Sequence, residues 1–204
     1  MGLHMGRTLA GQTLGVIGCG RIGRRVMELA QAFGMQVICH DPALPASMPL
    51  PQLLRTADII SLHCPLTEET YHMIDASALE QCKKGMVLIN TSRGALVDAE
   101  ALLAGIKSRK VGAACLDVYE EESDLFFEDN SGHILEDDTL ARLISMPNVI
   151  VTSHQAFLTE DALRSIAETT VRNLVDFARL GQSPNELCYR AGSTSDCRDG
   201  KCFS

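Results

Sequence analysis

Short apolar runs alternate along the chain with stretches in which apolar residues recur every three or four positions. The first pattern is typical of buried strands and the second of amphipathic helices. We predict strands over Leu14–Ile17, Val37–His40, Ile59–His63, Met86–Asn90, Val111–Leu116 and Val149–Val151. We predict helices over Arg24–Gly34, Gln52–Thr56, Ala76–Cys82, Ala99–Ser108 and Glu160–Leu180. This alternation indicates an α/β fold, a doubly wound parallel sheet with flanking helices.

Two stretches interrupt the alternation. Four prolines between residues 42 and 51 exclude a regular central strand, because proline cannot donate a hydrogen bond to a neighbouring strand. Residues 120–138 are acidic and irregular, and we expect a surface excursion anchored by Phe126 and Phe127. We divide the chain into a linker (residues 1–12), one domain closed by the last helix (residues 13–183) and a polar, disordered tail (residues 184–204).

A glycine motif ends the first predicted strand and opens the first predicted helix. The segment TLGVIGCGRIGRR carries Gly18, Gly20 and Gly23 in the spacing G-x-G-x-x-G. In a Rossmann-type fold Gly18 would form the tight turn, Gly20 would let the backbone approach a pyrophosphate, and Gly23 would let the helix pack closely on the strand. Glycine also marks ordinary turns, so the motif by itself is weak evidence.

Asp41 gives this motif its context, because it ends the second predicted strand, 18 residues after Gly23. A carboxylate at this point can accept hydrogen bonds from both ribose hydroxyls of an adenosine and would repel a 2′-phosphate. The sequence therefore predicts NAD, rather than NADP, as the cofactor. The alternative is that Asp41 only caps the end of its strand.

Composition limits the partners of the domain. The chain has 204 residues, 46% of them hydrophobic, which is enough for one well-buried core. The net charge of -8 argues against a nucleic-acid backbone or an anionic membrane as the main partner. Apolar runs are too short to span a bilayer and the N-terminus lacks the apolar region of a signal peptide, so we expect a cytoplasmic protein.

The eight cysteines follow no recognisable pattern of metal ligands or disulfides. Five of them stand singly in predicted strands, turns and helices, so we expect free thiols and no metal site. The other three are Cys188, Cys197 and Cys202 near the C-terminus. They offer the thiols for a soft metal or a redox pair, but their spacing fits no zinc site, and we interpret the segment as a polar tail.

Polar side chains follow several predicted strands. In an open parallel sheet, ligands bind at the carboxyl ends of the strands. These ends carry Asp41, Arg93, Asp117, Glu122 and His154. An arginine can hold a planar carboxylate through two hydrogen bonds, and a histidine beside a carboxylate can exchange a proton near neutral pH. Taken singly, Arg93 fits a solvated turn and His154 a structural role equally well, but together they indicate a site for a 2-keto acid.

Six segments of the chain together resemble one protein family. They are GVIGCGRIG, ISLHCPLT, NTSRGALVD, DVYEEE, DLFFED and SHQAFLT, in the family's order. The chain resembles the cofactor-binding domain of the NAD-dependent D-2-hydroxyacid dehydrogenases, in the D-lactate dehydrogenase branch. The resemblance implies reduction of pyruvate to D-lactate with NADH, and a homodimer formed through this domain.

The resemblance also implies a role for each candidate residue. Arg93 would bind the substrate carboxylate, His154 would be the acid and base, and Glu122 would pair with that histidine. Asp117 would contact the nicotinamide side of the cofactor. The other cofactor contacts would come from Gly18, Gly20, Arg21, Ile22, Gly23, Asp41, Cys64, Pro65, Thr91 and Ser92.

Two departures from the family pattern change the expectation. Family members carry a long segment before the glycine motif that forms much of a second, substrate-binding lobe, and this chain begins close to the motif. They also have a strand after the adenosine acid, for which residues 42–51 are too short. We therefore expect a sheet without that edge strand and a domain that is inactive by itself. The alternative is a stand-alone NAD-sensing or interaction module that has lost catalysis.

Overall fold

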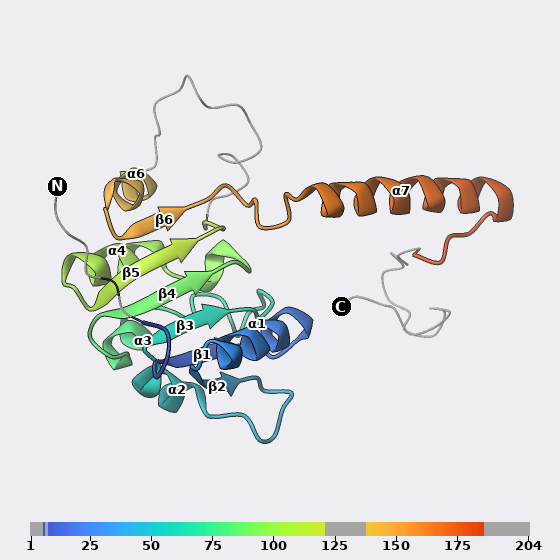
Figure 1. Ribbon diagram of the computed structural model, residues 1–204. Coiled ribbons are helices and arrows are strands. Elements are labelled where there is room, and N and C mark those ends of the chain that lie inside the picture. The colour runs from blue at the N-terminus through green and yellow to red at the C-terminus, as the bar shows by residue number, and fades with distance from the viewer. Residues whose placement is uncertain (1–5, 7, 121–137, 186–204) are drawn as a thin grey trace. The chain divides into compact units, whose positions relative to one another are not determined.

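The computed structural model of the chain describes residues 6, 8–120 and 138–185 (Figure 1). Its internal contacts form two compact units, residues 1–156 and residues 157–204. The first unit contains a six-stranded sheet, and the second contains a long helix.

The first unit is built on one parallel sheet. Its strands are β1 (Thr13–Ile17), β2 (Gln36–His40), β3 (Ile59–Leu62), β4 (Met86–Asn90), β5 (Val111–Leu116) and β6 (Val149–Val151). They lie in the order β2-β1-β3-β4-β5-β6, and every neighbouring pair is parallel. The predicted doubly wound sheet is therefore confirmed. The direction of winding reverses between β1 and β3, which is where such sheets bind ligands.

Helices cover the sheet on both faces (Figure 1). On one face lie α2 (Leu50–Thr56), α3 (Ala76–Gln81), α4 (Ala99–Lys107) and α6 (Asp138–Ser145), each in contact with the next. On the other face α1 (Arg21–Ala32) packs on β1 and β2. Helix α1 begins earlier than its apolar pattern predicts, so that it includes Gly23.

Alternate residues of the central strands point to these two helical layers. Ile60, Leu62 and Leu88 belong to the larger core cluster, under α2, α3, α4 and α6, and all three are fully buried. Leu14 and Val16 belong to the smaller cluster, under α1. Because β3 is buried on both faces, its sequence is a nearly continuous apolar run, as a central parallel strand requires.

Two aspartates determine where helices α3 and α4 begin. Asp75 accepts a hydrogen bond from the Ala78 N–H at 2.7 Å, and Asp98 accepts one from the Ala101 N–H at 3.0 Å. Each carboxylate satisfies a backbone donor that the first helical turn leaves without a partner. The segments that precede these caps leave the carboxyl ends of β3 and β4, so the caps also limit where those segments run.

The structure differs from the sequence pattern at α6, which the pattern does not predict. Leu140 and Leu143 on this helix are fully buried, but its apolar residues cover only two turns after an acidic stretch. Between Asp41 and Ile59 every residue is described and none forms a strand, so the expected lack of an edge strand is confirmed. The predicted excursion around Phe126 and Phe127 lies outside the described residues.

The second unit contains α7 (Glu160–Leu180). Thr159 caps its N-terminus by accepting a hydrogen bond from the Ala162 N–H at 3.2 Å, and Gly181 ends it in the left-handed conformation. Its apolar residues recur at helical spacing as predicted, but none of its residues is buried. That this helix closes the domain, with a boundary at residue 183, stays a prediction. From residue 186 on, the predicted tail lies outside the described residues.

Candidate functional site

The loop between β1 and α1 makes backbone contacts that only glycine permits. Gly18 has a φ of 94°, and a Cβ there would lie 2.5 Å from the Cys64 nitrogen. The Gly18 N–H donates to the His40 carbonyl at 2.9 Å. A Cβ on Gly23 would lie 2.1 Å from the Gly18 oxygen. The loop therefore turns tightly against the ends of β2 and β3, and α1 packs closely on it.

The remaining glycine of the motif faces open space. Gly20 precedes α1 in extended backbone, and a Cβ built on it would meet no atom within 4 Å. Among the described residues, no side chain caps this helix and no acidic residue lies in its first turn. Its first N–H groups, beside the exposed side chains of Arg21 and Ile22, are available to an anion such as a pyrophosphate.

Asp41 follows β2 directly and lies beside the glycine loop. Its Oδ2 accepts a hydrogen bond from the Cys19 N–H at 2.8 Å, and its Oδ1 accepts one from the Ala43 N–H at 2.9 Å. With these two bonds Asp41 caps the end of β2, which is the alternative role that the sequence left open. A carboxylate has about four acceptor positions, and this residue is partly exposed, so it can also accept bonds from ribose hydroxyls.

The end of β3 is bonded to the turn after β4. The Ser92 hydroxyl donates to the Cys64 carbonyl at 2.6 Å. Burial raises the pKa of the Cys64 thiol, which keeps it protonated and unreactive. His63 Nε2 lies 2.9 Å from the Ser61 hydroxyl, and burial lowers the pKa of this histidine. His63 is therefore neutral near pH 7 and acts as a structural hydrogen-bonding group.

Arg93 is exposed in the turn after β4, and a buried asparagine shapes that turn. Asn90 Nδ2 donates to the Arg93 carbonyl at 2.9 Å, while Asn90 Oδ1 accepts the Ser92 N–H at 3.1 Å. The Arg93 guanidinium donates to the Ser92 carbonyl at 2.7 Å and has further N–H groups for a ligand. Asn90 is absent from the predicted site residues, although an amide at the end of a buried apolar strand is a recognisable signal.

Asp117 builds the turn that carries His154. Its Oδ1 accepts hydrogen bonds from the Thr152 hydroxyl and the Gln155 N–H, and its Oδ2 accepts one from the Ala156 N–H at 3.0 Å. Its carbonyl accepts the His154 N–H at 2.7 Å. His154 has a φ of 51°, in the left-handed region that side chains rarely adopt. The bonds to Asp117 hold the histidine in this conformation.

The same bonds determine the charge of Asp117. Burial by itself would raise the pKa of this carboxyl, but hydrogen bonds from Thr152, Ala156 and Gln155, together with the nearby His154, bring it below its ordinary value. Asp117 is therefore ionised throughout the neutral range. Its predicted contact with the nicotinamide side of the cofactor stays a prediction.

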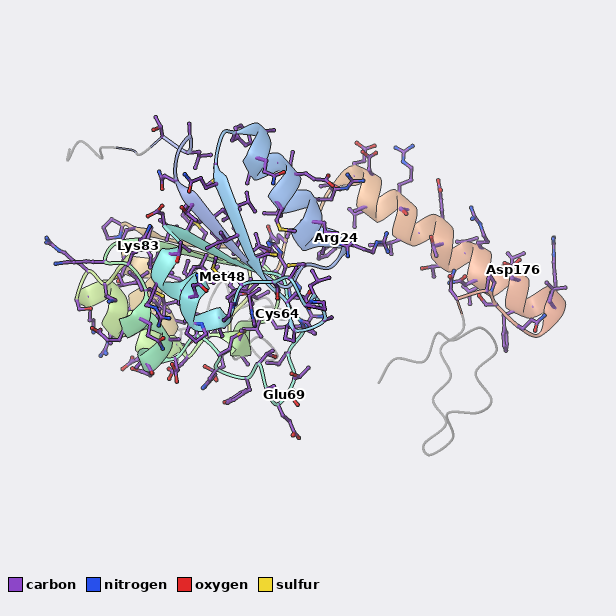
Figure 2. All side chains as sticks on the ribbon, turned by 90° about the horizontal axis from the view of Figure 1, so that it is seen from below. Arg24, Met48, Cys64, Glu69, Lys83 and Asp176 are labelled. Carbon is purple, nitrogen blue, oxygen red and sulfur yellow. The ribbon has the colours of Figure 1, made fainter. Side chains whose placement is uncertain are left out.

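Most of the predicted site residues thus lie along one edge of the sheet, where the strands end. The Asp117 N–H donates to the Asn90 carbonyl at 2.9 Å and extends the series of contacts from β4 to β5. Figure 2 shows Cys64 where the strands end. Pro65 and Thr91 are exposed on this edge. Glu122, the predicted partner of His154, lies outside the described residues, so that pairing stays a prediction.

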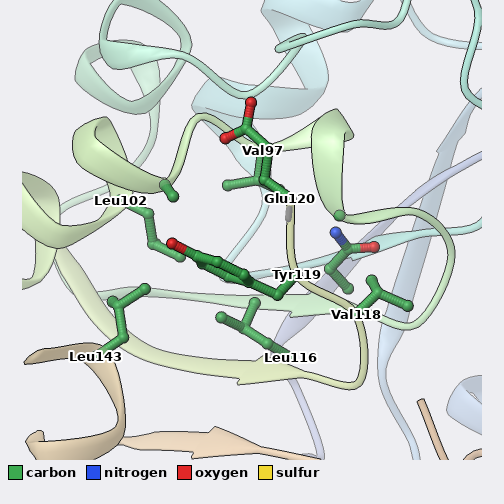
Figure 3. A pocket seen from close by; sticks show the side chains of 10 residues that line it. Val97, Leu102, Leu116, Val118, Tyr119, Glu120 and Leu143 are labelled. Atoms are coloured by element: carbon green, nitrogen blue, oxygen red, sulfur yellow. The ribbon is translucent and has the colours of Figure 1, made fainter. Parts of the chain in front are cut away.

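A cavity beside this edge is too small for an organic ligand. Asn90, Leu116, Tyr119 and Leu143 are among its lining residues, and its volume is about 10 Å³, which is room for one water at most. Figure 3 shows the Tyr119 ring along the apolar lining, whereas the Glu120 carboxylate points away from it. The candidate site is therefore the solvent-exposed edge itself.

Metal ligands and thiols were the other candidate chemistry. Within residues 6, 8–120 and 138–185, no three His, Cys, Asp or Glu side chains are grouped so that they could hold a metal ion. The five described cysteines are free thiols, as predicted, and Cys188, Cys197 and Cys202 lie outside that range. Of the helices in the described part of the chain, none is both long and apolar enough to cross a membrane.

A family model matches most of the chain. Residues 2–156 match the model described as D-isomer specific 2-hydroxyacid dehydrogenase, NAD binding domain. The matched range spans almost the whole first unit, from the glycine loop to the turn that carries His154.

Individual proteins give the same result. The chain is 45% identical over 190 residues to the D-lactate dehydrogenase of Escherichia coli K12, covering 89% of this chain and 58% of that protein. It is 42% identical over 194 residues to an aromatic 2-oxoacid reductase of Clostridium sporogenes, covering 91% and 59%. Its structure resembles that of the D-lactate dehydrogenase from Aquifex aeolicus complexed with NAD and lactic acid, with a TM-score of 0.79, 38% identity, and coverage of 86% and 56%. The chain spans a little over half the length of these relatives.

We predict that alanine substitutions at Gly20 and Gly23 have different effects: the first impairs cofactor binding and the second impairs folding. Gly20→Ala should leave the free energy of unfolding within about 1 kcal/mol of the wild type, because its Cβ meets no protein atom. It should weaken NADH binding by about tenfold or more, because the methyl group keeps the pyrophosphate away. Gly23→Ala should destabilise the fold itself. Urea unfolding and NADH fluorescence titration measure the two effects, and wild-type NADH affinity in Gly20→Ala would remove that glycine from the cofactor site.

A second prediction concerns the pH dependence of stability. Because the folded-state pKa of Asp117 is lowered, its contribution is fully present above the unfolded-state value of about 3.9 and is lost as pH falls through that value toward the folded-state pKa. Asp117→Asn should reduce the free energy of unfolding at pH 7 by about 1–3 kcal/mol and should flatten its decline below about pH 5. Urea unfolding at a series of pH values measures both effects. An equally steep decline in the variant would contradict the role assigned to this carboxylate.

Proposed function

The chain belongs to the D-isomer specific 2-hydroxyacid dehydrogenase family, and from this premise we propose that Arg93 and His154 of its NAD-binding domain act in the reduction of pyruvate to D-lactate by NADH. The main support is that these side chains follow β4 and β6, the two strands that flank β5 in the sheet. Arg93 lies in the turn after β4, and His154 lies in a turn bonded to the residue after β5. Strands β4 and β5 pair along their length, so both side chains belong to the edge that also carries the glycine loop.

The residues at the ends of β1 and β2 fit NAD. The open face of Gly20 and the uncapped start of α1 suit a pyrophosphate, and the Asp41 carboxylate suits the hydroxyls of an adenosine ribose. The extra phosphate of NADP would place a second negative charge beside Asp41. We assign the remaining cofactor contacts to Arg21, Ile22, Gly18, Gly23, Cys64, Pro65, Thr91, Ser92 and Asp117.

When bound, the cofactor supplies a hydride, and the side chains of the chain hold the keto acid and supply the proton. Arg93 binds the carboxylate through two parallel hydrogen bonds, which fixes the face of the carbonyl carbon that is presented. His154 donates a proton to the keto oxygen. Asp117 holds the turn that orients His154, and we propose that Glu122 pairs with His154. Oxidation of D-lactate runs the same step in reverse, with His154 accepting the proton.

The substrate is part of the proposal, because the chain spans a little over half the length of its relatives. D-lactate follows from the names of the Escherichia coli and Aquifex aeolicus proteins, and pyruvate is the keto acid that oxidation of lactate gives. The Clostridium sporogenes protein is named for aromatic 2-oxoacids. These acids share a carboxylate next to the reacting carbon. Arg93 and His154 would recognise this shared part.

A fusion protein tests the catalytic proposal. Residues 1–204 by themselves should bind NADH but turn over little pyruvate, because orientation of the substrate and exclusion of water need both sides of a pocket. Fusion to the part of the Escherichia coli relative outside the aligned region should give pyruvate-dependent loss of NADH absorbance. In the fusion, Arg93→Ala and His154→Ala should each lower kcat/KM by about 100-fold or more.

A matched control for this test is Arg109→Ala. Arg109 is an exposed arginine that precedes β5, on the opposite edge of the sheet from the site, so kcat/KM should stay at the wild-type value. Full activity in the His154→Ala fusion would exclude the acid role of His154. Rapid pyruvate turnover by residues 1–204 without the fusion partner would show that the second lobe is dispensable.

Asp41 variants test the choice between NADH and NADPH. Asp41→Asn keeps an acceptor for the Cys19 N–H but removes the negative charge, so it should mainly relax the exclusion of NADPH. Asp41→Ala also removes the bond to the loop and should weaken NADH binding by about tenfold or more. Calorimetric titration of both variants with both cofactors gives the four affinities. If neither variant binds NADPH better than the wild type, Asp41 does not select the cofactor.

We also propose that this domain forms a homodimer through α1. Leu29 on α1 and Phe33 directly after this helix are 61% and 62% exposed, and their spacing of four residues places them on the same side. Arg25 and Glu28 form an ion pair on the same helix. A two-fold axis across α1 would let this apolar stripe cover itself in a second copy of the chain.

Substitution of Phe33 tests the dimer. Phe33→Asp should shift the protein toward the monomer in sedimentation velocity, because it places a charge in the apolar contact. The matched control is Ile144→Asp, which changes a 50% exposed apolar residue on α6 and should leave the association state unchanged. A wild-type protein that stays monomeric at high concentration would contradict the proposal.

A further inference from the structure

Three segments meet at one end of the sheet. The first is the turn that carries Arg93, and the second is the loop of residues 63–75 after β3, which returns past that turn. The His72 N–H donates to the Ala95 carbonyl at 2.8 Å, and the Ile74 N–H donates to the Leu96 carbonyl at 3.1 Å. Ile74 also forms an isolated parallel bridge with Val97. The loop therefore pairs with the Arg93 turn almost as an added strand. Figure 2 shows Glu69 at the projecting end of this loop.

The third segment is the chain that continues from β5, and it packs on the same turn from another side. A Cβ on Gly94 would lie 1.9 Å from the Tyr119 oxygen and 2.5 Å from the Glu120 nitrogen. The residue next to Arg93 thus rests directly on the backbone of these two residues. Any shift of Glu120 moves the surface that supports the Arg93 turn.

A side-chain hydrogen bond connects the loop to this third segment. His72 Nε2 is hydrogen-bonded to Glu120 Oε1, and the Tyr71 hydroxyl donates to the same oxygen at 3.4 Å. The Tyr71 and His72 rings stack with centroids 3.9 Å apart. The two bonded side chains are 27% and 25% exposed, so water competes for this hydrogen bond less than it would on an open surface.

His72 holds an unfavourable backbone conformation to make this contact. Its φ is 49°, in the left-handed region that residues with a Cβ rarely occupy. Among the described residues with a side chain, this region is shared only by Arg109 and His154. Strained residues persist where surrounding contacts hold them, and they are concentrated at functional sites. For His72 the holding contacts are the bond to Ala95, the ring stack and the hydrogen bond to Glu120.

We propose that His72 is a positioning residue for substrate binding, and that its pair with Glu120 holds the Arg93 turn between the loop of residues 63–75 and the chain after β5. The inference rests on the proposed role of Arg93. Loss of the pair would leave the guanidinium present but less well directed at the carboxylate. The effect should therefore appear in the affinity for a keto acid and not in the affinity for NADH, whose contacts lie mainly at β1, β2 and β3.

The test uses NMR titration of the 204-residue chain, saturated with NADH, with oxamate, an amide isostere of pyruvate. His72→Asn is the main variant, because asparagine tolerates the left-handed conformation but is too short to reach Glu120. We expect it to raise the oxamate Kd by about three- to tenfold and to leave the NADH Kd within about twofold. His72→Gln, whose amide can donate to Glu120, should recover most of the oxamate affinity.

Two further variants complete the design. Arg109→Asn changes the left-handed residue on the opposite edge of the sheet and should leave both affinities unchanged. Arg93→Ala should abolish the oxamate response and so tests the proposed function separately. Amide hydrogen exchange at Ile74 and Asp98, whose N–H groups bond across the loop and the turn, should speed up in His72→Asn but not in His72→Gln.

The outcomes separate the two ideas. Wild-type oxamate affinity in His72→Asn, or the same loss in His72→Gln as in His72→Asn, would overturn the positioning role while Arg93 keeps its own. An oxamate response that survives Arg93→Ala, or is missing from the NADH-bound wild type, would overturn the role of Arg93 and the inference with it. A rise in the NADH Kd equal to the rise in the oxamate Kd would show that His72 is merely structural.

Discussion

The geometry of the site depends on the close approach of β1 and β3 at their carboxyl ends. Gly18 lies so near the Cys64 backbone that even one added carbon would overlap it, and the Gly18 N–H is bonded to the end of β2 at the same time. One residue therefore sets the spacing of three strand ends. The hydrogen bond from the Cys19 N–H to the Asp41 carboxylate holds Asp41 beside these strand ends. On the other side, the Cys64 carbonyl anchors Ser92 and with it the turn of Arg93.

Buried polar side chains hold the turns at the other strand ends in place. Asn90 is 1% exposed and shapes the Arg93 turn, and Asp117 is 6% exposed and shapes the His154 turn. Each of them satisfies backbone groups that would otherwise be left without partners when the strands end. A buried polar group that is fully bonded is costly to move, because every bond must be replaced at once. The exposed Arg93 can thus stand on a rigid turn, which suits a residue that must meet a carboxylate in a fixed geometry.

Backbone strain is distributed in the same way. His72, beside the segment that follows β4, and His154, which follows β6, adopt left-handed conformations, and hydrogen bonds to neighbouring segments hold both. Arg109 has the same conformation on the opposite edge, in the turn that joins α4 to β5, where its N–H bonds to the Ile106 carbonyl in the last turn of α4. The difference is that the two histidines are held by residues from other strand ends. The positions of the two histidines therefore depend on how the segments at this edge of the sheet pack against one another.

The sequence by itself determined the parallel sheet, the bounds of its strands to within a residue, the glycine loop and the position of Asp41, because apolar runs and glycine spacing are local properties. It did not determine α6, since a two-turn apolar pattern is too short to stand out from an acidic stretch. Leu29 and Ala30 are adjacent apolar residues of α1, and only the packed structure shows that Ala30 is buried and Leu29 is 61% exposed. Tertiary structure alone brought His72 to Glu120, 48 residues away, and bound Asp117 to the turn of His154 at Ala156, 39 residues away. Such contacts depend on how separate loops cross the end of a sheet, and no spacing within a single segment encodes that.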